Sequence, residues 1–312
     1  MLPIIYSIPV FVIGVFFLWK SSDFLVDGTC KTAAQIGVST LIISVILVGF
    51  GTSAPEFAIS VGSAVQKNAD ISLGNIIGSC VANLLLVLGI STIIRPITVR
   101  KGIIKREAPI MLLATLILLV SAYFSLLDKY HILGGIFFLV FFVIFVLYFI
   151  GCARRERVSC EKIDPGKTGK NIFFIIIGIA GVVFGAYLLI ESAVSIANFF
   201  SVPTFFIAIT IVAVGTSLPE LVVSAMAAYK EKDDIAVGNV LGSNVFNILL
   251  ILGVSAIFIP LGAVLSVNLI IILLAVSLIM FPILYTGHRI SRLEGVFMLI
   301  MYSVFIWYSY VV

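Results

Sequence analysis

Two glutamates draw attention because each lies inside an apolar stretch, at the end of the same short motif. Residues 51–56 read Gly-Thr-Ser-Ala-Pro-Glu and residues 215–220 read Gly-Thr-Ser-Leu-Pro-Glu. An ionised carboxylate in such surroundings is costly unless something compensates its charge. A buried Lys or Arg is the usual structural answer, but the apolar stretches that hold Glu56 and Glu220 contain no basic residue away from their ends. A bound cation or a proton is the remaining compensator.

Oxygen-bearing side chains gather around both glutamates. Hydroxyls lie within one turn of each, and a Ser and an Asn four residues apart share a helix face on the next apolar stretch. Pro55 and Pro219 each remove a backbone donor, so freed carbonyls of a broken helix can face a cavity. The side chains concerned are Thr52, Ser53, Ser79 and Asn83 in the first half, and Thr216, Ser217, Ser243 and Asn247 in the second.

These residues have simpler interpretations when taken singly. The serines suit close helix packing and the asparagines suit an interhelical hydrogen bond. Their occurrence in both halves beside a buried glutamate favours a site. Its ligands are all oxygen, which hard cations such as Ca²⁺ and Na⁺ prefer, whereas Zn²⁺ and Cu²⁺ prefer nitrogen and sulfur. The four cysteines form no CxxC pair and there are only two histidines, so we expect no cofactor and no thiolate or histidine metal centre.

Composition fixes the class of protein that must position these residues. Of 312 residues, 62% are hydrophobic and 11% are charged, whereas a soluble domain has about 25% charged residues. Apolar stretches recur along the whole chain, so one removable signal peptide does not explain them. We therefore expect an all-α membrane protein in a lipid bilayer, with no nucleic-acid partner. No nucleophile–base constellation appears, so we expect no enzyme activity.

The apolar stretches predict ten transmembrane helices, since each span needs about 20 residues. The first either stops near Leu18 or continues through the polar segment 20–34. The longest loop covers residues 153–170. The predicted spans begin near Pro3, Ser39, Asp70, Ile103, Tyr130, Asn171, Pro203, Asp234, Val264 and Leu293.

The distribution of Lys and Arg predicts the orientation of these spans. Alternate loops place seventeen of the 19 basic residues on one side, including six in the central loop, and only Lys67 and Lys129 on the other. Basic loops stay in the cytoplasm. Both termini are therefore expected outside and the central loop inside, with the protein in the cell membrane.

An internal repeat appears when the chain is shifted by 164 residues. The two glutamate motifs coincide, as do Gly74-Asn75 with Gly238-Asn239 and Pro96 with Pro260. We predict a first five-helix repeat at 1–152, a linker at 153–170 and a second repeat at 171–312. An odd number of spans per half inverts the second copy, which is typical of secondary transporters. A channel or an intramembrane enzyme could share this topology without requiring it.

At these motifs the sequence resembles the cation/calcium exchanger superfamily, specifically its sodium/calcium exchanger branch of prokaryotic type. Both halves carry Gly-Thr-Ser-x-Pro-Glu followed by Gly-Asn-x-x-Gly-Ser-x-x-x-Asn. The resemblance implies that Glu56 and Glu220 bind calcium and that the nearby Thr, Ser and Asn side chains share in sodium sites. It also implies ligation by backbone carbonyls near Gly49 and Ala213.

The resemblance and the residues together predict an antiporter that exchanges Ca²⁺ for Na⁺ by alternating access. Potassium-dependent relatives carry Asp where this chain has Asn247, so potassium independence is expected. The proton/calcium branch typically reads Gly-Asn-Ala-x-Glu at the first motif, unlike residues 51–56. A proton-coupled calcium antiporter in which Glu56 and Glu220 titrate stays open as an alternative. A calcium-permeable channel is a more distant one.

Overall fold

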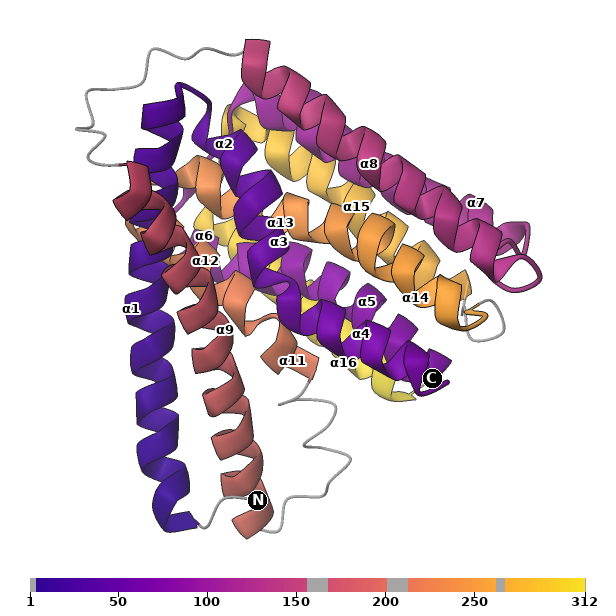
Figure 1. The fold of residues 1–312 in the computed structure, drawn as a ribbon, viewed down its shortest axis with the longest axis horizontal. Helices are drawn as coiled ribbons and strands as arrows, with labels where there is room; N and C mark the ends of the chain where they lie inside the picture. Colours follow the sequence, from indigo (N-terminus) through magenta and orange to yellow (C-terminus); the bar gives the residue numbers. More distant parts are fainter. Residues whose placement is uncertain (1–3, 156–167, 201–212, 262–266, 312) are drawn as a thin grey trace.

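The computed structural model describes residues 4–155, 168–200, 213–261 and 267–311. Within them the regular secondary structure is helical except for one short strand pair (Figure 1). The first half contains α1 (Ile4–Ile36), α2 (Thr40–Ile43), η1 (Ser44–Val48), α3 (Gly49–Thr52), α4 (Ala54–Val65), α5 (Ala69–Ala82), η2 (Asn83–Val87), α6 (Leu88–Ile94), β1 (Ile97–Thr98), η3 (Ile103–Glu107), α7 (Ala108–Tyr123) and α8 (His131–Arg155). The second half contains α9 (Thr168–Phe199), α11 (Ala213–Thr216), α12 (Leu218–Tyr229), α13 (Asp233–Val245), η5 (Phe246–Ile251), α14 (Leu252–Phe258), α15 (Val267–Tyr285), η6 (Thr286–His288), β2 (Arg289–Ile290) and α16 (Arg292–Val311).

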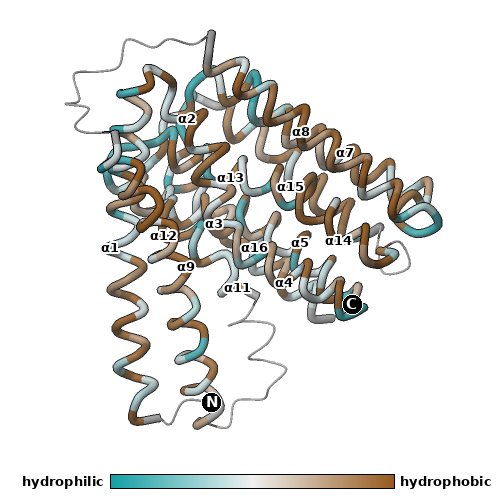
Figure 2. Tube along the Cα trace, in the orientation of Figure 1, coloured by the Kyte–Doolittle hydropathy of each residue, from teal (hydrophilic) through white to brown (hydrophobic). Residues whose placement is uncertain are grey.

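Several of these helices are long and apolar enough to cross a bilayer. Six described helices qualify, and a seventh span results if the pair Thr40–Thr52 and Ala54–Val65, bent by 49°, is counted as one. Figure 2 shows hydrophobic residues along the helices and hydrophilic residues gathered at many of their ends. The chain is thus an all-helical membrane protein. The expected span starts near Pro203 and Val264 lie outside the described residues.

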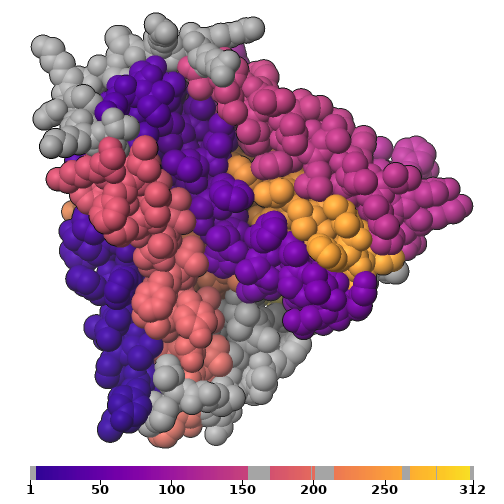
Figure 3. Space-filling view, viewed as in Figure 1, coloured from indigo at the N-terminus to yellow at the C-terminus, as the bar shows by residue number. Residues whose placement is uncertain are grey.

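The first helix is longer than the shorter of the two predicted alternatives. α1 is continuous from Ile4 to Ile36, so it runs through the polar segment 20–34 rather than stopping near Leu18. It lies beside α9 along most of its length (Figures 1 and 3). Glycines permit this close approach, since a Cβ on Gly181 would come within 2.1 Å of the Ser21 hydroxyl.

Two helices at the centre of the molecule are almost wholly enclosed. The continuous helical segments Ala69–Ile94 and Asp233–Phe258 are 78% and 83% buried over their most apolar windows, against 28% or less for α1, α8 and α9. A Cβ on Gly242 would lie 2.4 Å from the carbonyl oxygen of Val45, so glycine lets α13 contact the η1 backbone. These two segments carry the buried polar side chains Ser79, Asn83, Ser243 and Asn247.

The helices that carry the two glutamate motifs are both interrupted one residue before a Pro-containing turn. Ser53 (φ −79°, ψ 10°) separates α3 from α4, and Ser217 (φ −85°, ψ 5°) separates α11 from α12. Each Pro is the second residue of its new helix, where the missing N–H removes no helical hydrogen bond. The break and the proline together place Glu56 and Glu220 in the first turn of α4 and α12.

Other irregular features also recur 164 residues apart. Lys67 (φ 63°) and Glu231 (φ 62°) both adopt the left-handed conformation after the glutamate helices. Asn83 begins the π-helical turn η2, and Asn247 lies in the π-helical turn η5. A π turn inserts one residue and rotates the side chains that follow, and such turns occur frequently at functional sites.

A candidate cation site between the two broken helices

The structure buries all ten side chains that the sequence analysis selected. None is more than 3% exposed, and both glutamates are completely buried. They come from α3, α4, α5 and η2 in the first half and from α11, α12, α13 and η5 in the second, or from the single residues that join these elements. The cluster comprises Thr52, Ser53, Glu56, Ser79, Asn83, Thr216, Ser217, Glu220, Ser243 and Asn247.

Hydrogen bonds cross between the two halves at the carboxyl groups. Ser53 Oγ donates to Glu220 Oε1 at 2.9 Å, and Ser217 Oγ donates to Glu56 Oε1 at 3.4 Å. Ser243 Oγ lies 3.2 Å from the same Glu220 oxygen. Each glutamate also sits at a helix N-terminus, where the helix dipole stabilises negative charge. The serine at each break therefore holds the carboxyl group of the opposite half, which unites the two motifs in one site.

Several buried oxygen atoms of this cluster have no hydrogen-bond partner in the described part of the chain. They are the second carboxyl oxygens of Glu56 and Glu220, Asn83 Oδ1 and Asn247 Oδ1. Ser79 Oγ makes no well-formed hydrogen bond either, but it lies next to the Glu56 carboxyl group. Among the described residues, neither carboxyl group forms an ion pair with Lys or Arg. A buried polar atom left unpaired costs about 1–3 kcal/mol. A desolvated cation bound among these oxygen atoms would provide the partner that each of them lacks.

Asn75 and Asn239 complete the cluster, although the sequence analysis did not select them as site residues. Asn239 Nδ2 lies 3.0 Å from Ser224 Oγ and 3.3 Å from the carbonyl oxygen of Glu220, while its Oδ1 accepts from Thr52 at 3.0 Å. Asn75 makes the matching contacts in the other half, with Nδ2 lying 3.4 Å from the Glu56 carbonyl oxygen. Their recurrence in both halves of the sequence was the signal that could have identified them.

The two backbone positions selected from the resemblance differ in what the structure describes. The carbonyl oxygen of Gly49 accepts from Ser243 Oγ at 3.3 Å, so it borders the cluster. A Cβ on Gly49 would lie 3.0 Å from the backbone nitrogen of Ser243, which explains the need for glycine there. Ala213 is the first residue of α11, and the chain directly before it lies outside the described residues.

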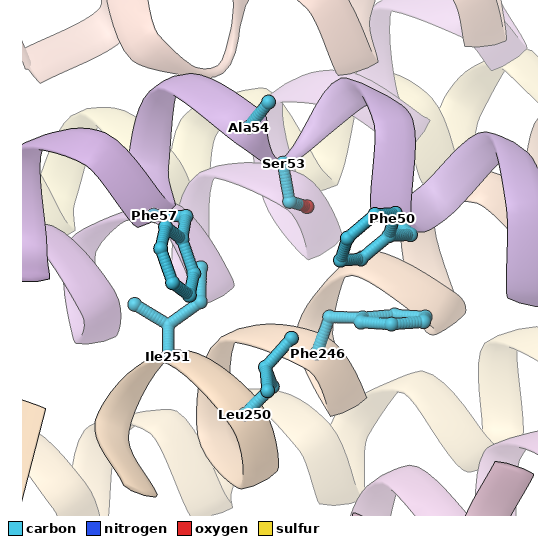
Figure 4. Close-up of a pocket in the computed structure, with 7 residues that line it drawn as sticks. All are labelled: Phe50, Ser53, Ala54, Phe57, Phe246, Leu250 and Ile251. Carbon is cyan, nitrogen blue, oxygen red and sulfur yellow. The ribbon is translucent and has the colours of Figure 1, made fainter. Parts of the chain in front are cut away.

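A small apolar cavity of about 140 Å³ borders the cluster (Figure 4). Ser53 contributes its only hydroxyl, and the other lining residues are apolar: Phe50, Ala54, Phe57, Phe246, Leu250 and Ile251. Such a lining offers a cation no ligands beyond Ser53. The cavity therefore belongs to the apolar packing around the site rather than to the set of ligands.

A separate ionic cluster joins α1 to the end of α12. Lys230 contacts the carboxyl groups of Asp23 and Asp27, the latter at 2.7 Å. Burial works against the charged form of Lys230, but its hydrogen bonds to the two aspartates outweigh burial and raise its pKa. The side chains of Asp23 and Asp27 are both partly exposed. Among the described residues, no ion pair joins Asp23, Asp27 or Lys230 to Glu56 or Glu220.

Known proteins resemble this chain over almost its whole length. The family model for the sodium/calcium exchanger protein matches residues 6–151 and 170–311. The sodium/calcium exchanger MaX1 of Methanosarcina acetivorans is 33% identical, over 95% of this chain and 96% of that protein. The inner membrane protein YrbG of Escherichia coli is 32% identical, over 80% of this chain and 79% of its own length.

Solved structures agree with these sequence relationships. The sodium-calcium exchanger NCX_Mj, in crystals soaked with zero Na⁺ and Ca²⁺, superposes with a TM-score of 0.84 and 31% identity, over 97% of this chain and 98% of its own. A shared fold at this level, with a family model matching both glutamate motifs, leaves one conclusion. This chain belongs to the sodium/calcium exchanger protein family.

Proposed function

We propose that this protein is a secondary active antiporter that exchanges Ca²⁺ for Na⁺ across the membrane by alternating access. The observation that carries the proposal is the buried pair Glu56 and Glu220, with unpaired oxygens and no basic partner among the described residues. Family membership and the named activity of the relative MaX1 support the same function. Family membership and the relative's named activity both favour transport over catalysis.

The ten buried side chains supply the ligands in this proposal. The two carboxylates carry two negative charges and therefore neutralise one Ca²⁺. The hydroxyl and amide oxygens fill further ligand positions, since Ca²⁺ takes six to eight oxygen ligands and tolerates irregular geometry. Sodium ions use the same carboxylates together with the hydroxyl and amide oxygens, and the Gly49 and Ala213 carbonyls add backbone ligands. Because both ions need the same atoms, binding of one excludes the other, and this competition is the physical basis of exchange.

The topology of the proposal contains ten transmembrane helices in two inverted five-helix repeats, at residues 1–152 and 171–312. Features recurring 164 residues apart support it, including the breaks at Ser53 and Ser217. The charge asymmetry places the linker 153–170 in the cytoplasm and both termini outside. The name of the relative YrbG supports a location in the cell membrane.

Calcium flux into proteoliposomes tests the function. Vesicles loaded with sodium and diluted into choline medium should take up ⁴⁵Ca²⁺, and vesicles loaded with choline should not. Uptake driven by a proton gradient without sodium would favour the proton-coupled alternative. Calcium current with no counter-ion would favour a channel. Either result would overturn the proposal.

A further inference from the structure

Asn244 is a buried polar residue that the proposed mechanism does not use. It is 0% exposed and lies three residues before Asn247. The residue 164 positions earlier is Cys80, so the two halves differ in chemistry at this position.

The hydrogen bonds of Asn244 fix the orientation of its amide. Its Nδ2 donates to the backbone carbonyl oxygen of Cys80 at 3.1 Å. A carbonyl oxygen only accepts, so the nitrogen of the Asn244 amide must face Cys80 and Oδ1 must face the other way. That oxygen accepts from Asn83 Nδ2 at 3.0 Å.

The orientation of the Asn244 amide in turn determines that of Asn83. With its Nδ2 turned toward Asn244, Asn83 must present Oδ1 on the opposite side of its amide. Asn83 Oδ1 is buried and has no hydrogen-bond partner among the described residues. A rotated Asn83 amide would instead present N–H groups to a cation and lose its bond to Asn244.

The corresponding asparagine of the second half, Asn247, has no such amide neighbour, because the residue that matches Asn244 in the first half is Cys80. A thiol is only a weak donor and acceptor, and the Cys80 Sγ lies 3.9 Å from the backbone carbonyl oxygen of Asn244. Asn247 has the Cys80 thiol as its side-chain neighbour, and neither of its polar atoms makes a well-formed hydrogen bond in the described part of the chain. The amide of Asn83 is therefore held by another amide, whereas that of Asn247 has only a weakly bonding thiol beside it.

We propose that Asn244 is a positioning residue that holds the Asn83 carbonyl oxygen toward the bound cation. This inference rests on the proposed function, because it assigns Asn83 Oδ1 as a ligand. It also makes the two halves of the site unequal, because Asn83 is held by an amide and Asn247 has only the Cys80 thiol beside it.

Calcium-dependent flux tests the coupling between the two asparagines. Asn244→Ala should raise the KM for ⁴⁵Ca²⁺ in sodium-driven uptake about tenfold, which corresponds to one hydrogen bond at a buried site. In an Asn83→Ala background the same change should have no further effect. A merely structural role would lower uptake equally in both backgrounds, and that result would overturn the inference. The control Ser255→Ala removes a buried hydroxyl from α14 and should leave KM within twofold.

Asn83→Asp provides a rescue test. Both oxygens of a carboxylate accept, so an Asp at this position needs no neighbour to orient it. Asn244→Ala should therefore no longer raise the calcium KM in this background, and a persistent tenfold rise would contradict the proposal. If Asn244→Ala does not fold, Asn244→Cys, which installs the residue of the first half, replaces it. Absence of sodium-driven uptake in the wild type would instead refute the proposed function.

Discussion

Glu220→Gln offers the sharpest test of the two-carboxylate site. The substitution keeps the shape of the side chain and removes one negative charge from a completely buried position. The Glu220 carboxyl accepts from Ser53 at 2.9 Å and lies 3.2 Å from Ser243 Oγ, and its second oxygen has no partner in the described residues. An amide can retain the hydroxyl contacts but cannot replace the charge that faces the ion.

The size of the effect follows from the cost of removing one partner of a buried charge pair, about 3–5 kcal/mol. At about 1.4 kcal/mol for each factor of ten, calcium affinity should fall at least 100-fold. A ligand present at 100 times its dissociation constant stabilises the folded state by about 2.7 kcal/mol. Most of that calcium-dependent stabilisation should therefore disappear in the variant.

Two measurements are needed, because loss of transport alone does not distinguish a lost ligand from a damaged fold. ⁴⁵Ca²⁺ uptake should be abolished, while the thermal unfolding temperature in calcium-free detergent should be unchanged or higher, since one unpaired buried charge is gone. The rise in unfolding temperature on adding calcium should be lost. Glu231→Gln, at a side chain that is 72% exposed, is the matched control and should behave like the wild type. Normal uptake by Glu220→Gln would refute the assignment of this carboxylate as a ligand.

Three further predictions concern ion choice, topology and packing. Wild-type sodium-driven calcium flux should persist when potassium is replaced by choline, and its loss would contradict this assignment of Asn247. Asn247→Asp should make calcium flux more pH-dependent, because a third carboxylate in the cluster disfavours ionisation of the others. In a background without other cysteines, membrane-impermeant labelling should find Cys160 cytoplasmic and Lys129→Cys external, and labelling of both from one side would refute the inverted arrangement. Gly51→Ala should lower the free energy of unfolding by about 1–3 kcal/mol, because the new Cβ would lie 2.4 Å from Ile179 Cδ1. Chemical denaturation measures this loss of stability. Adding Ile179→Val, which removes Cδ1, should make the loss smaller.

The sequence alone was sufficient for the class of protein and for the selection of two glutamates that the structure buries. Hydropathy selects membrane helices because a bilayer accepts only segments whose backbone is internally hydrogen-bonded. The repeated motifs identified Glu56 and Glu220, and the prolines located the helix breaks, since both are local effects of residue type. Close helix contact at glycine differs between the two halves. Gly238 and Gly242 lie against the backbone and side chains of residues 41–45, whereas a Cβ built on Gly74 or Gly78 would meet no described atom within 4 Å beyond its own stretch of helix.

Only the tertiary structure decided which side chains meet across the site. Ser53 reaches Glu220 rather than the glutamate of its own motif, because the two broken helices face each other and each break presents its hydroxyl to the opposite half. The π-helical turns at Asn83 and Asn247 shift side-chain directions by an amount that a 3.6-residue period does not predict. The orientation of the Asn83 amide depends on Asn244, a residue 161 positions away. Local sequence determines where a helix breaks, but contacts between distant helices determine which oxygen atoms meet at the candidate site.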